Sequence, residues 1–416
     1  MPSLAIILAG ISLPIWTVLT FFRGAFWQLR QFDDDCHPER SEGSQPQIPS
    51  EPVREGATPS GLPTRWPRIV AVLPARNEAQ TISSTVESLV VQDYPGEFCI
   101  IVVDDHSEDQ TADLAQRAAQ AKGAGDRVTV IQAAPLQSGW TGKLWAMQQG
   151  IEKAASSPPD YFWFIDADII HAPDTLRRLV SRAEIQRLDL ASLMVLLQAK
   201  TLPERLLIPP FLYFFLKLYP PRWIADKKAH TAGAAGGCIL LRSSALHRIG
   251  GISAIRDEVI DDCSLARAAK RTGGAIWMGL TRRSVSLRAY GTFGEIRDLI
   301  ARTAFTQLHY SGLLLLAAVL GMVLTYLIPV ILLFDTHALV WCTSLLAWAL
   351  MTVTYLPTVR FYKLSPFWAP LLPLAAAFYS YATFLSAIRY WLGRGGQWKG
   401  RAQALVNRAG GKRIEG

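Results

Sequence analysis

The sequence has few of the features that mark a disulfide-rich, zinc-binding or nucleotide-hydrolysing protein. Only 5 of its 416 residues are Cys, which excludes a disulfide scaffold, and no two of them have zinc-ligand spacing. It contains no G-x-x-x-x-G-K-[ST] loop and no G-x-G-x-x-G sequence, which disfavours nucleotide hydrolases and dehydrogenases. Its 42 Lys and Arg against 34 Asp and Glu give a net charge of +8, which excludes an acidic disordered protein.

Hydrophobic residues make up half of the chain, an ordinary share, but they are concentrated at the two ends. The N-terminal run Leu4–Phe22 carries no charge and has nearly the minimum length for spanning a bilayer. A secretory signal peptide would need a basic segment before the run and a small-residue cleavage site after it. Because Phe21-Phe22-Arg23 follows instead, we interpret the run as an uncleaved membrane anchor.

Three further uncharged runs follow in the C-terminal third: Ser311–Phe334, Ala338–Leu356 and Pro366–Ile388. The first of them has 24 residues, which as a helix would be roughly 36 Å long. A buried core helix explains one such run but hardly three. Pro370 and Pro373 break the last run, so a re-entrant or interfacial course is an alternative to a full span.

A further apolar stretch, Leu206–Pro220, is too short to span a bilayer. Its aromatic residues and its flanking cations Arg205, Lys217 and Arg222 favour a helix at the membrane interface. A core helix with an exposed edge is the alternative.

The basic residues of the short loops predict the topology of the spans. They lie beside the central domain, at Arg23, Arg30, Arg297, Arg302, Arg360 and Lys363. Residues 335–337 include no Lys or Arg. This pattern predicts an external N-terminus and a cytoplasmic central domain. The basic tail should also lie inside, which conflicts with an odd number of C-terminal spans.

We therefore divide the chain into six segments. They are an anchor (1–30), a flexible linker rich in Pro, Ser, Glu and Gly (31–66), a central domain (67–292), an amphipathic connecting helix (293–310), a C-terminal membrane region (311–392) and a basic tail (393–416).

Short apolar segments alternate with polar-faced helical ones in the central domain. We expect strands at Ile69–Leu73, Phe98–Val103, Val128–Ile131 and Tyr161–Ile165, and helices at Glu78–Val91, Thr111–Ala121 and Lys143–Ala155. This alternation predicts an α/β fold with a mostly parallel sheet covered on both faces. Ligands of such sheets bind beyond the carboxyl ends of the strands.

Three of those strand ends carry unusual polar sequences. They read PARNE (74–78), DDHS (104–107) and DAD (166–168). Helix capping explains any one of them but hardly five carboxylates at one sheet edge. Because crowded carboxylates repel, cations or hydrogen-bond donors should compensate them. Asp166 and Asp168 also suit Mg²⁺ or Mn²⁺ shared with substrate phosphates.

Two later clusters lie at predicted helix starts. Lys143 follows Gly139-Trp140-Thr141-Gly142, where a phosphate could meet its ammonium and free backbone amides. Asp261 and Asp262 open the helix that runs to Lys270. Acids at a helix start ordinarily cap it, whereas an acid near a sugar-acceptor hydroxyl could be a general base.

The ordered motifs PARNE, VVDDHS, GKLWAMQQG, DAD, AGGC and DDCSLA resemble the family-2 inverting glycosyltransferases. The resemblance covers about Arg68 to Tyr310, and it implies a GT-A nucleotide-sugar-binding domain. The C-terminal runs resemble the membrane-bound branch of that family. The sequences GWTGKLW (139–145), IDDC (260–263) and RTAFTQL (302–308) resemble those of the hopene-associated glycosyltransferases of bacterial hopanoid gene clusters.

The resemblance implies a role for each matching residue on the donor side. Asp104 and Asp105 would hold the uracil and ribose of a UDP-type donor. The nucleotide pocket would be lined by Pro74, Arg76 and Glu78, with Lys143 approaching the nucleotide.

It also implies the metal ligands and the base. Asp166 would lie near the donor, and Asp168 would bind the Mg²⁺ or Mn²⁺ that bridges the diphosphate, with Asp166 as a further ligand. Gly236 and Gly237 would allow donor and acceptor to approach closely. Asp262 matches the second acid of the family's Glu-Asp pair, the expected base, and Asp261 replaces the Glu.

One departure concerns the acceptor side. Membrane members usually carry Q-x-x-R-W, whereas residues 302–310 read RTAFTQLHY. Arg302 and Gln307 are the candidate substitutes, on the acceptor or diphosphate side. This departure and the small number of spans disfavour a processive polysaccharide synthase.

The sequence therefore predicts a metal-dependent, hexosyltransferase-type enzyme of the bacterial inner membrane, with its catalytic domain in the cytoplasm. It would move a sugar from a nucleotide donor to a lipid acceptor, which the resemblance suggests is a hopanoid or other polyisoprenoid. The alternatives are a non-catalytic membrane scaffold of a lipid pathway and a polysaccharide synthase. Nucleic-acid binding is disfavoured, because the basic residues lie beside the spans and in the tail, where membrane lipids are the simpler partner.

Overall fold

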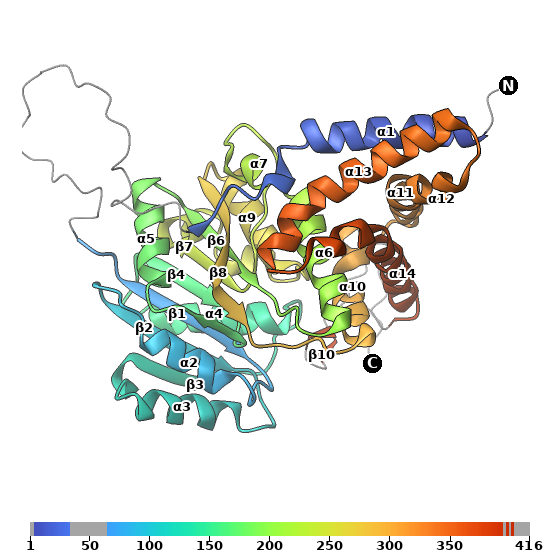
Figure 1. The fold of residues 1–416 in the computed structure, drawn as a ribbon. Coiled ribbons are helices and arrows are strands. Elements are labelled where there is room, and N and C mark those ends of the chain that lie inside the picture. The colour runs from blue at the N-terminus through green and yellow to red at the C-terminus, as the bar shows by residue number, and fades with distance from the viewer. Residues whose placement is uncertain (1–3, 34–64, 394–396, 399–400, 403–416) are drawn as a thin grey trace, which may run out of the picture.

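The computed structural model describes residues 4–33, 65–393, 397–398 and 401–402. An α/β domain lies beside a group of long apolar helices, and α6 (Leu202–Leu218) and α10 (Phe293–Gln307) lie between the two (Figure 1). Most of the predicted linker and of the predicted basic tail falls outside the described residues.

The central sheet has the strand order β3-β2-β1-β4-β7-β6-β8-β5. Its strands are β1 (Ile69–Ala75), β2 (Phe98–Asp104), β3 (Val128–Gln132), β4 (Tyr161–Ile165), β5 (Ile169–His171), β6 (Leu190–Leu196), β7 (Cys238–Arg242) and β8 (Ile276–Ser286). Strands β1 to β4 pair in parallel, as do β6 and β8, whereas β7 and β5 run antiparallel to their neighbours. The predicted mostly parallel α/β sheet is confirmed.

The helices of the domain follow the strands in the predicted order. They are α2 (Ile82–Val90), α3 (Thr111–Ala121), α4 (Gly142–Ala154), α5 (Thr175–Ile185), α7 (Pro221–Ala225), α8 (Ser243–Arg248) and α9 (Asp261–Arg271). Helix α2 begins four residues later than predicted. Asn77 takes a left-handed φ of 50°, and the amide of Ala79 donates to Asp109 Oδ2, so the chain forms a loop before the helix starts.

Helix α6 (Leu202–Leu218) is a core helix rather than the favoured interface helix. Thr201 and Glu204 form a capping box at its start. Leu207, Tyr213 and Leu216 are fully or almost fully buried. The Tyr213 hydroxyl lies 2.9 Å from Thr354 Oγ1 of α13 (Ala338–Phe361), so one face of α6 packs against the apolar helices.

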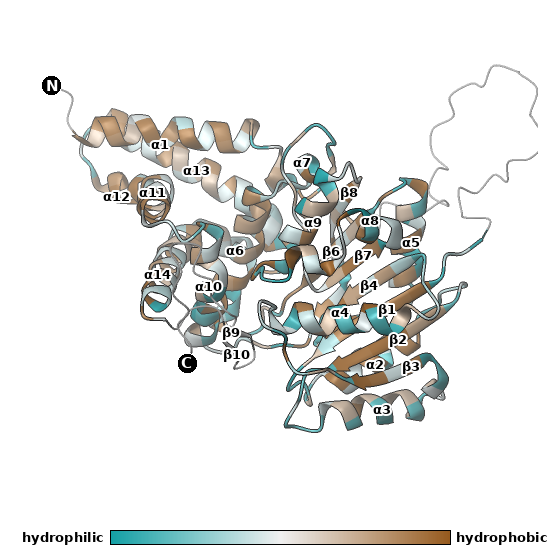
Figure 2. Cartoon of the chain, turned by 180° about the vertical axis from the view of Figure 1, so that it is seen from behind, coloured by the Kyte–Doolittle hydropathy of each residue, from teal (hydrophilic) through white to brown (hydrophobic). Residues whose placement is uncertain are grey.

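Among the described residues, four helical segments are long and apolar enough to cross a membrane: Leu4–Phe21, Gly312–Phe334, Ala338–Phe361 and Pro366–Trp391. They comprise α1 (Leu4–Phe21), α11 (Gly312–Met322), the π-helical turn η5 (Val323–Leu327), α12 (Ile328–Ile331), η6 (Leu332–Phe334), α13, η7 (Pro366–Leu371) and α14 (Leu372–Trp391). Figure 2 shows α1, α11 and α12 largely hydrophobic on the visible face, whereas α3 carries hydrophilic residues. Because side chains such as Leu313 and Phe334 are 75% and 89% exposed, these helices need apolar surroundings.

Residues 31–33, which the predicted linker (31–66) includes, bind to the central domain. The amide of Leu280 donates to Gln31 O at 2.9 Å, and Phe32 forms a parallel bridge with Leu280. Thr281 Oγ1 donates to Asp33 Oδ2 at 2.7 Å. Residues 31–33 therefore pack along β8 and are not part of a flexible linker.

Both ends of the Pro366–Trp391 segment lie next to elements that join the central domain. The segment begins just after the C-terminal end of α13. There Arg282 Nε of β8 donates to Phe361 O at 3.0 Å. At the far end, Arg389 pairs with Asp298 at 2.7 Å, on the connecting helix α10 (Phe293–Gln307).

Candidate active site

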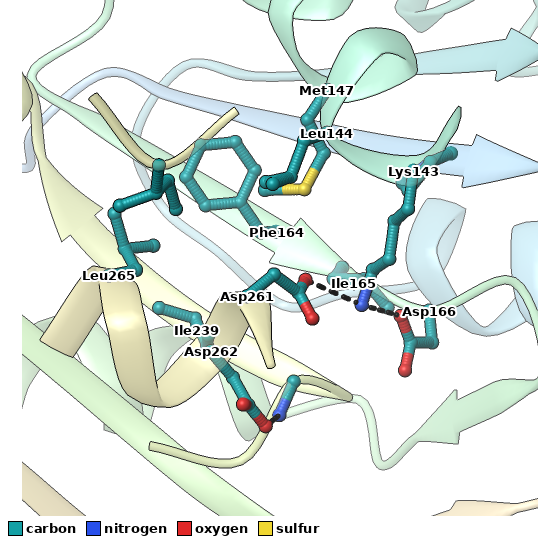
Figure 3. Close-up of a pocket in the computed structure, with 13 residues that line it drawn as sticks. Lys143, Leu144, Met147, Phe164, Ile165, Asp166, Ile239, Asp261, Asp262 and Leu265 are labelled. Atoms are coloured by element: carbon teal, nitrogen blue, oxygen red, sulfur yellow. Dashed lines mark hydrogen bonds and ion pairs between the residues drawn. The ribbon is translucent and has the colours of Figure 1, made fainter. Parts of the chain in front are cut away.

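Two cations lie among the carboxylates at the strand ends, as the crowding of charge predicts. Lys143 Nζ, from the first turn of α4, lies 2.9 Å from Asp166 Oδ1 and 3.0 Å from Asp261 Oδ2. Figure 3 shows this ammonium between the two carboxylates. On the other side, Arg288 lies 2.8 Å from Glu78 Oε1 and 3.1 Å from Asp168 Oδ2.

These contacts change the proton affinities of the groups. Burial acts to lower the pKa of Lys143, but the two carboxylates outweigh it and raise that pKa above its ordinary value. Burial raises the pKa of Asp166, and Asp168 and Asp261 add to this, while Lys143 opposes it. The ammonium therefore stays charged, and it keeps the acidic cluster together.

Asp262 is held by the backbone on both oxygens. Its Oδ2 accepts from the Gly236 amide at 2.9 Å, and its Oδ1 accepts from the Cys263 amide at 2.7 Å. Burial, with a further contribution from Asp261, raises the pKa of Asp262 to about 6. Figure 3 shows the Asp262 carboxylate directed away from the Lys143 ammonium. A fixed carboxylate with this pKa suits a general base at neutral pH.

A polar cavity of about 170 Å³ lies above the strand ends. Both cations, Lys143 and Arg288, line it together with Glu78, Asp166 and Asp168. Pro74, Asp261, Tyr290 and Arg302 complete much of its wall. The cavity is thus rich in groups that can bind a diphosphate and a divalent ion.

An apolar groove of about 380 Å³ begins where the polar cavity ends. Its walls come from α6, the start of α9, α10, α11 and α14, through residues such as Phe211, Phe215, Ile300, Val319, Met322 and Thr383. Val259, Asp261 and Arg302 line both spaces, and Asp262 lines the groove. The acid pair of α9 therefore stands at the junction of a polar and an apolar space.

The two tentative acceptor-side residues lie on α10. Arg302 is at the junction just described, whereas Gln307 lines the apolar groove only. Gln307 Nε2 donates to the Tyr219 hydroxyl at 2.7 Å. Gln307 thus positions a phenol in the groove wall.

Five of the predicted residues line neither of these two spaces: Arg76, Asp104, Asp105, Gly236 and Gly237. Asp104 and Asp105 are buried beneath the loop after β1, and Arg76 donates to the carbonyls of Asp105 and His106. A Cβ at Gly237 would come within 3.1 Å of Val195 Cγ2, so this glycine serves packing of the sheet. Asp104 Oδ1 is buried without a hydrogen-bond partner among the described residues.

The residues at the polar cavity fit a divalent ion. Asp166 and Asp168 offer carboxylate oxygens there, which Mg²⁺ and Mn²⁺ prefer. No group of three or more His, Cys, Asp or Glu with metal-site geometry occurs among the described residues. Two protein carboxylates leave further positions for diphosphate oxygens and water, which is the usual arrangement for Mg²⁺.

Sequence reasoning missed Arg288, Tyr290 and Glu258, all of which line the polar cavity. Arg288 follows β8, two residues beyond the strand end at Ser286. Because β8 pairs in parallel with β6, the rule that ligands bind at carboxyl strand ends would have found it.

Comparison with known proteins agrees with this geometry. Residues 70–250 match the family described as "Glycosyl transferase family 2". An N-acetylglucosaminyltransferase of Mesorhizobium japonicum is 32% identical over 141 residues, which are 34% of this chain and 31% of that protein. A 4,4'-diaponeurosporenoate glycosyltransferase of Staphylococcus aureus is 31% identical over 120 residues, which are 28% of each chain. The chain thus spans about a third of these relatives' length.

The fold is also found in a solved structure. The mannosyltransferase PcManGT of Pyrobaculum calidifontis, in complex with GDP-Man and Mn²⁺, is 16% identical with a TM-score of 0.52, and the match covers 92% of this chain and 98% of that one. At this identity the likeness speaks for the fold alone, and it extends over the apolar helices as well as the sheet. Residues 70–250 of this chain are thus similar to glycosyl transferase family 2, and the domain that contains them has the GT-A fold.

Proposed function

We propose that the protein is an inverting glycosyltransferase that moves a sugar from a nucleotide-diphosphate sugar to a lipid acceptor. The observation that carries this proposal is the meeting of the polar cavity with the apolar groove at Asp261 and Arg302. A charged donor and an apolar acceptor can each occupy a space of matching chemistry, and their reacting groups then meet beside Asp262.

The donor occupies the polar cavity in this proposal. Its diphosphate lies near Lys143 and Arg288, and its base and ribose extend toward Asp104 and the loop after β1. A divalent ion bound by Asp168 and Asp166 would supply charge stabilisation for the departing diphosphate. The ammonium of Lys143 contributes to the same stabilisation from the protein itself.

Asp262 acts as the general base. It takes the proton from an acceptor hydroxyl while that oxygen forms a bond to the anomeric carbon. The bond from that carbon to the diphosphate breaks at the same time, and the electron pair leaves with the nucleotide. A single displacement from the opposite side inverts the anomeric configuration.

The acceptor in this proposal is a lipid. The resemblance of the sequence motifs to the hopene-associated glycosyltransferases suggests a hopanoid or another polyisoprenoid. The groove supports a lipid because Phe211, Phe215 and Met322 form its walls and because candidate membrane helices contribute to it. By its printed name, the S. aureus relative glycosylates diaponeurosporenoate. We place the enzyme in the bacterial inner membrane with its catalytic domain in the cytoplasm.

The test is a donor screen on the purified full chain, with UDP- and GDP-sugars, with and without Mn²⁺. We expect Asp168→Ala to abolish donor binding. Asp262→Asn should retain donor binding but lose turnover by about 10²- to 10⁴-fold, the usual worth of a general base. The matched control is Asp226→Asn, at an exposed position.

Binding of no nucleotide sugar by the wild type would favour the non-catalytic scaffold instead. A lipid profile of a deletion strain identifies the acceptor, because the unglycosylated lipid accumulates. An unchanged lipid profile, together with transfer to a polysaccharide, would contradict the lipid acceptor.

A further inference from the structure

Lys217 of α6 is a cation on the wall of the apolar groove. Its Nζ donates to the Tyr326 hydroxyl at 2.8 Å. The same ammonium lies 4.8 Å from the centre of the Tyr326 ring and 5.1 Å from that of Phe214. It is thus held by two rings and one neutral oxygen.

The described residues offer this ammonium no carboxylate within ion-pair distance. A second cation lies nearby: Arg23 Nε donates to the backbone carbonyl of Lys217 at 3.0 Å, and its guanidinium lies over Trp223. Burial and the charge of Arg23 together lower the pKa of Lys217 to about 8. Two neighbouring cations in a partly apolar setting call for an anion.

A neutral hydroxyl acceptor would satisfy Asp262 but would leave Lys217 without a counter-charge. Rings compensate a desolvated cation only in part, since a cation–π contact is worth about 0.5 to 2 kcal/mol. A phosphate or carboxylate would accept charge-assisted hydrogen bonds from the ammonium, which are stronger than those of a neutral phenol. The groove also has room for an apolar chain beside Lys217, along Phe215 and Leu218.

We propose that Lys217 binds an anionic oxygen group, a phosphate or a carboxylate, of a lipid that lies in the apolar groove. This proposal rests on the proposed function in one respect: it takes the apolar groove as the binding site of the acceptor lipid. The anionic group is either part of the acceptor itself or the headgroup of a bilayer lipid that enters the groove.

The experiment measures binding rather than turnover, so that it is independent of the proposed function. The purified full chain in a neutral detergent is titrated with dodecyl phosphate, by calorimetry and by native mass spectrometry. We expect Lys217→Met to weaken binding by at least about tenfold, since a hydrogen bond to a charged group is lost. Lys217→Arg should retain most of the affinity, and the exposed Lys228→Met should match the wild type.

Equal dodecyl phosphate affinity of the wild type and Lys217→Met would overturn the proposal. If Lys217→Met does not fold, the Arg variant decides: loss of phosphate binding in a folded, still cationic variant also counts against it. If glycosyl transfer is absent while binding of dodecyl phosphate still depends on Lys217, the proposed function is contradicted and this inference is not.

Vesicles then distinguish the two sources of the anion. The chain is reconstituted in phosphatidylcholine alone or mixed with phosphatidylglycerol, and the lipids retained after extraction are identified. Retention of phosphatidylglycerol by the wild type but not by Lys217→Met supports a bilayer headgroup. Lys217-dependent binding of dodecyl phosphate without retained phosphatidylglycerol supports an anionic group on the acceptor.

Discussion

The ammonium of Lys143 lies 3.0 Å from a carboxylate oxygen of Asp261. This contact joins the first turn of α4, on the donor side, to the first turn of α9, which carries the proposed base. The same ammonium contacts Asp166 at 2.9 Å. One side chain therefore sets both the spacing and the charge balance of the two halves of the site.

The pH dependence of turnover should report Asp262. A base works only when it is deprotonated, and the pKa of Asp262 is raised to about 6. We expect kcat/KM to rise with pH through about 6 and to level off above it. The measurement is a pH–rate profile in the presence of saturating metal. An acid limb near pH 4, where an ordinary carboxyl titrates, would contradict the assignment of Asp262.

Replacing Lys143 with Met should move that acid limb. Lys143 lowers the pKa of Asp262, so its removal should raise this pKa and shift the limb to higher pH. Turnover at neutral pH should fall by roughly 10²-fold or more, because stabilisation of the leaving diphosphate is lost as well. The control is Lys153→Met, an exposed lysine on the same helix. An unshifted limb would show that Lys143 does not act on the base.

The sequence predicts much of the fold because its strands are apolar without interruption and its helices are amphipathic. Strand β4 is buried at every position, and it was predicted with its bounds. The crowding of Asp166 and Asp168 also predicted nearby cations, and the structure supplies Lys143 and Arg288. These features follow from local pattern and simple charge repulsion.

Other features depend on contacts between distant segments and could not be read from local pattern. Helix α6 resembles an interface helix because its apolar residues surround it, and its burial depends on α13 and α14. The placement of Asp104 below the cavity depends on how Arg76 spans the loop after β1. The apolar groove is formed by five separate elements, so no single stretch of sequence reveals it.

Gly236 should tolerate Ala but not Val. An added Cβ would lie 3.4 Å from both Asp262 Oδ2 and Lys143 Nζ, which is an ordinary contact. The branched side chain of Val would force its methyl groups against these charged atoms. We expect Gly236→Ala to keep activity within a few-fold and Gly236→Val to lose at least about 10²-fold, as misplacement at an active site commonly does. The measurement is kcat with donor affinity and the melting temperature measured in parallel.

If Gly236→Val melts like the wild type yet loses turnover, the loss lies at the site. Wild-type turnover of the Val variant would mean that the space beside Asp262 and Lys143 is not used in the reaction.

Glu204 links the start of α6 to the loop that carries Arg288. Its carboxylate accepts from the amides of Lys200 and Thr201, and its Oε1 accepts from the Tyr290 amide at 2.8 Å. These hydrogen bonds outweigh burial and lower the pKa of Glu204 below its ordinary value of 4.5. The stabilisation they give is complete above that ordinary pKa, and it is lost as pH falls through the lowered folded-state value.

Glu204→Gln should therefore cost about 1 to 2 kcal/mol at neutral pH, as loss of a capping contact does. Glu295→Gln is the matched control, because Glu295 closes the same kind of capping box on α10 but is solvent-exposed. We expect the cost of the Glu204 change, measured by denaturant melts, to shrink toward pH 3 as the wild-type carboxyl is protonated. The Glu204 variant should also weaken donor binding, since Tyr290 and Arg288 line the polar cavity, whereas the Glu295 variant should leave it unchanged. Equal effects of the two variants on donor affinity would show that the tie between Glu204 and Tyr290 does not position the donor site.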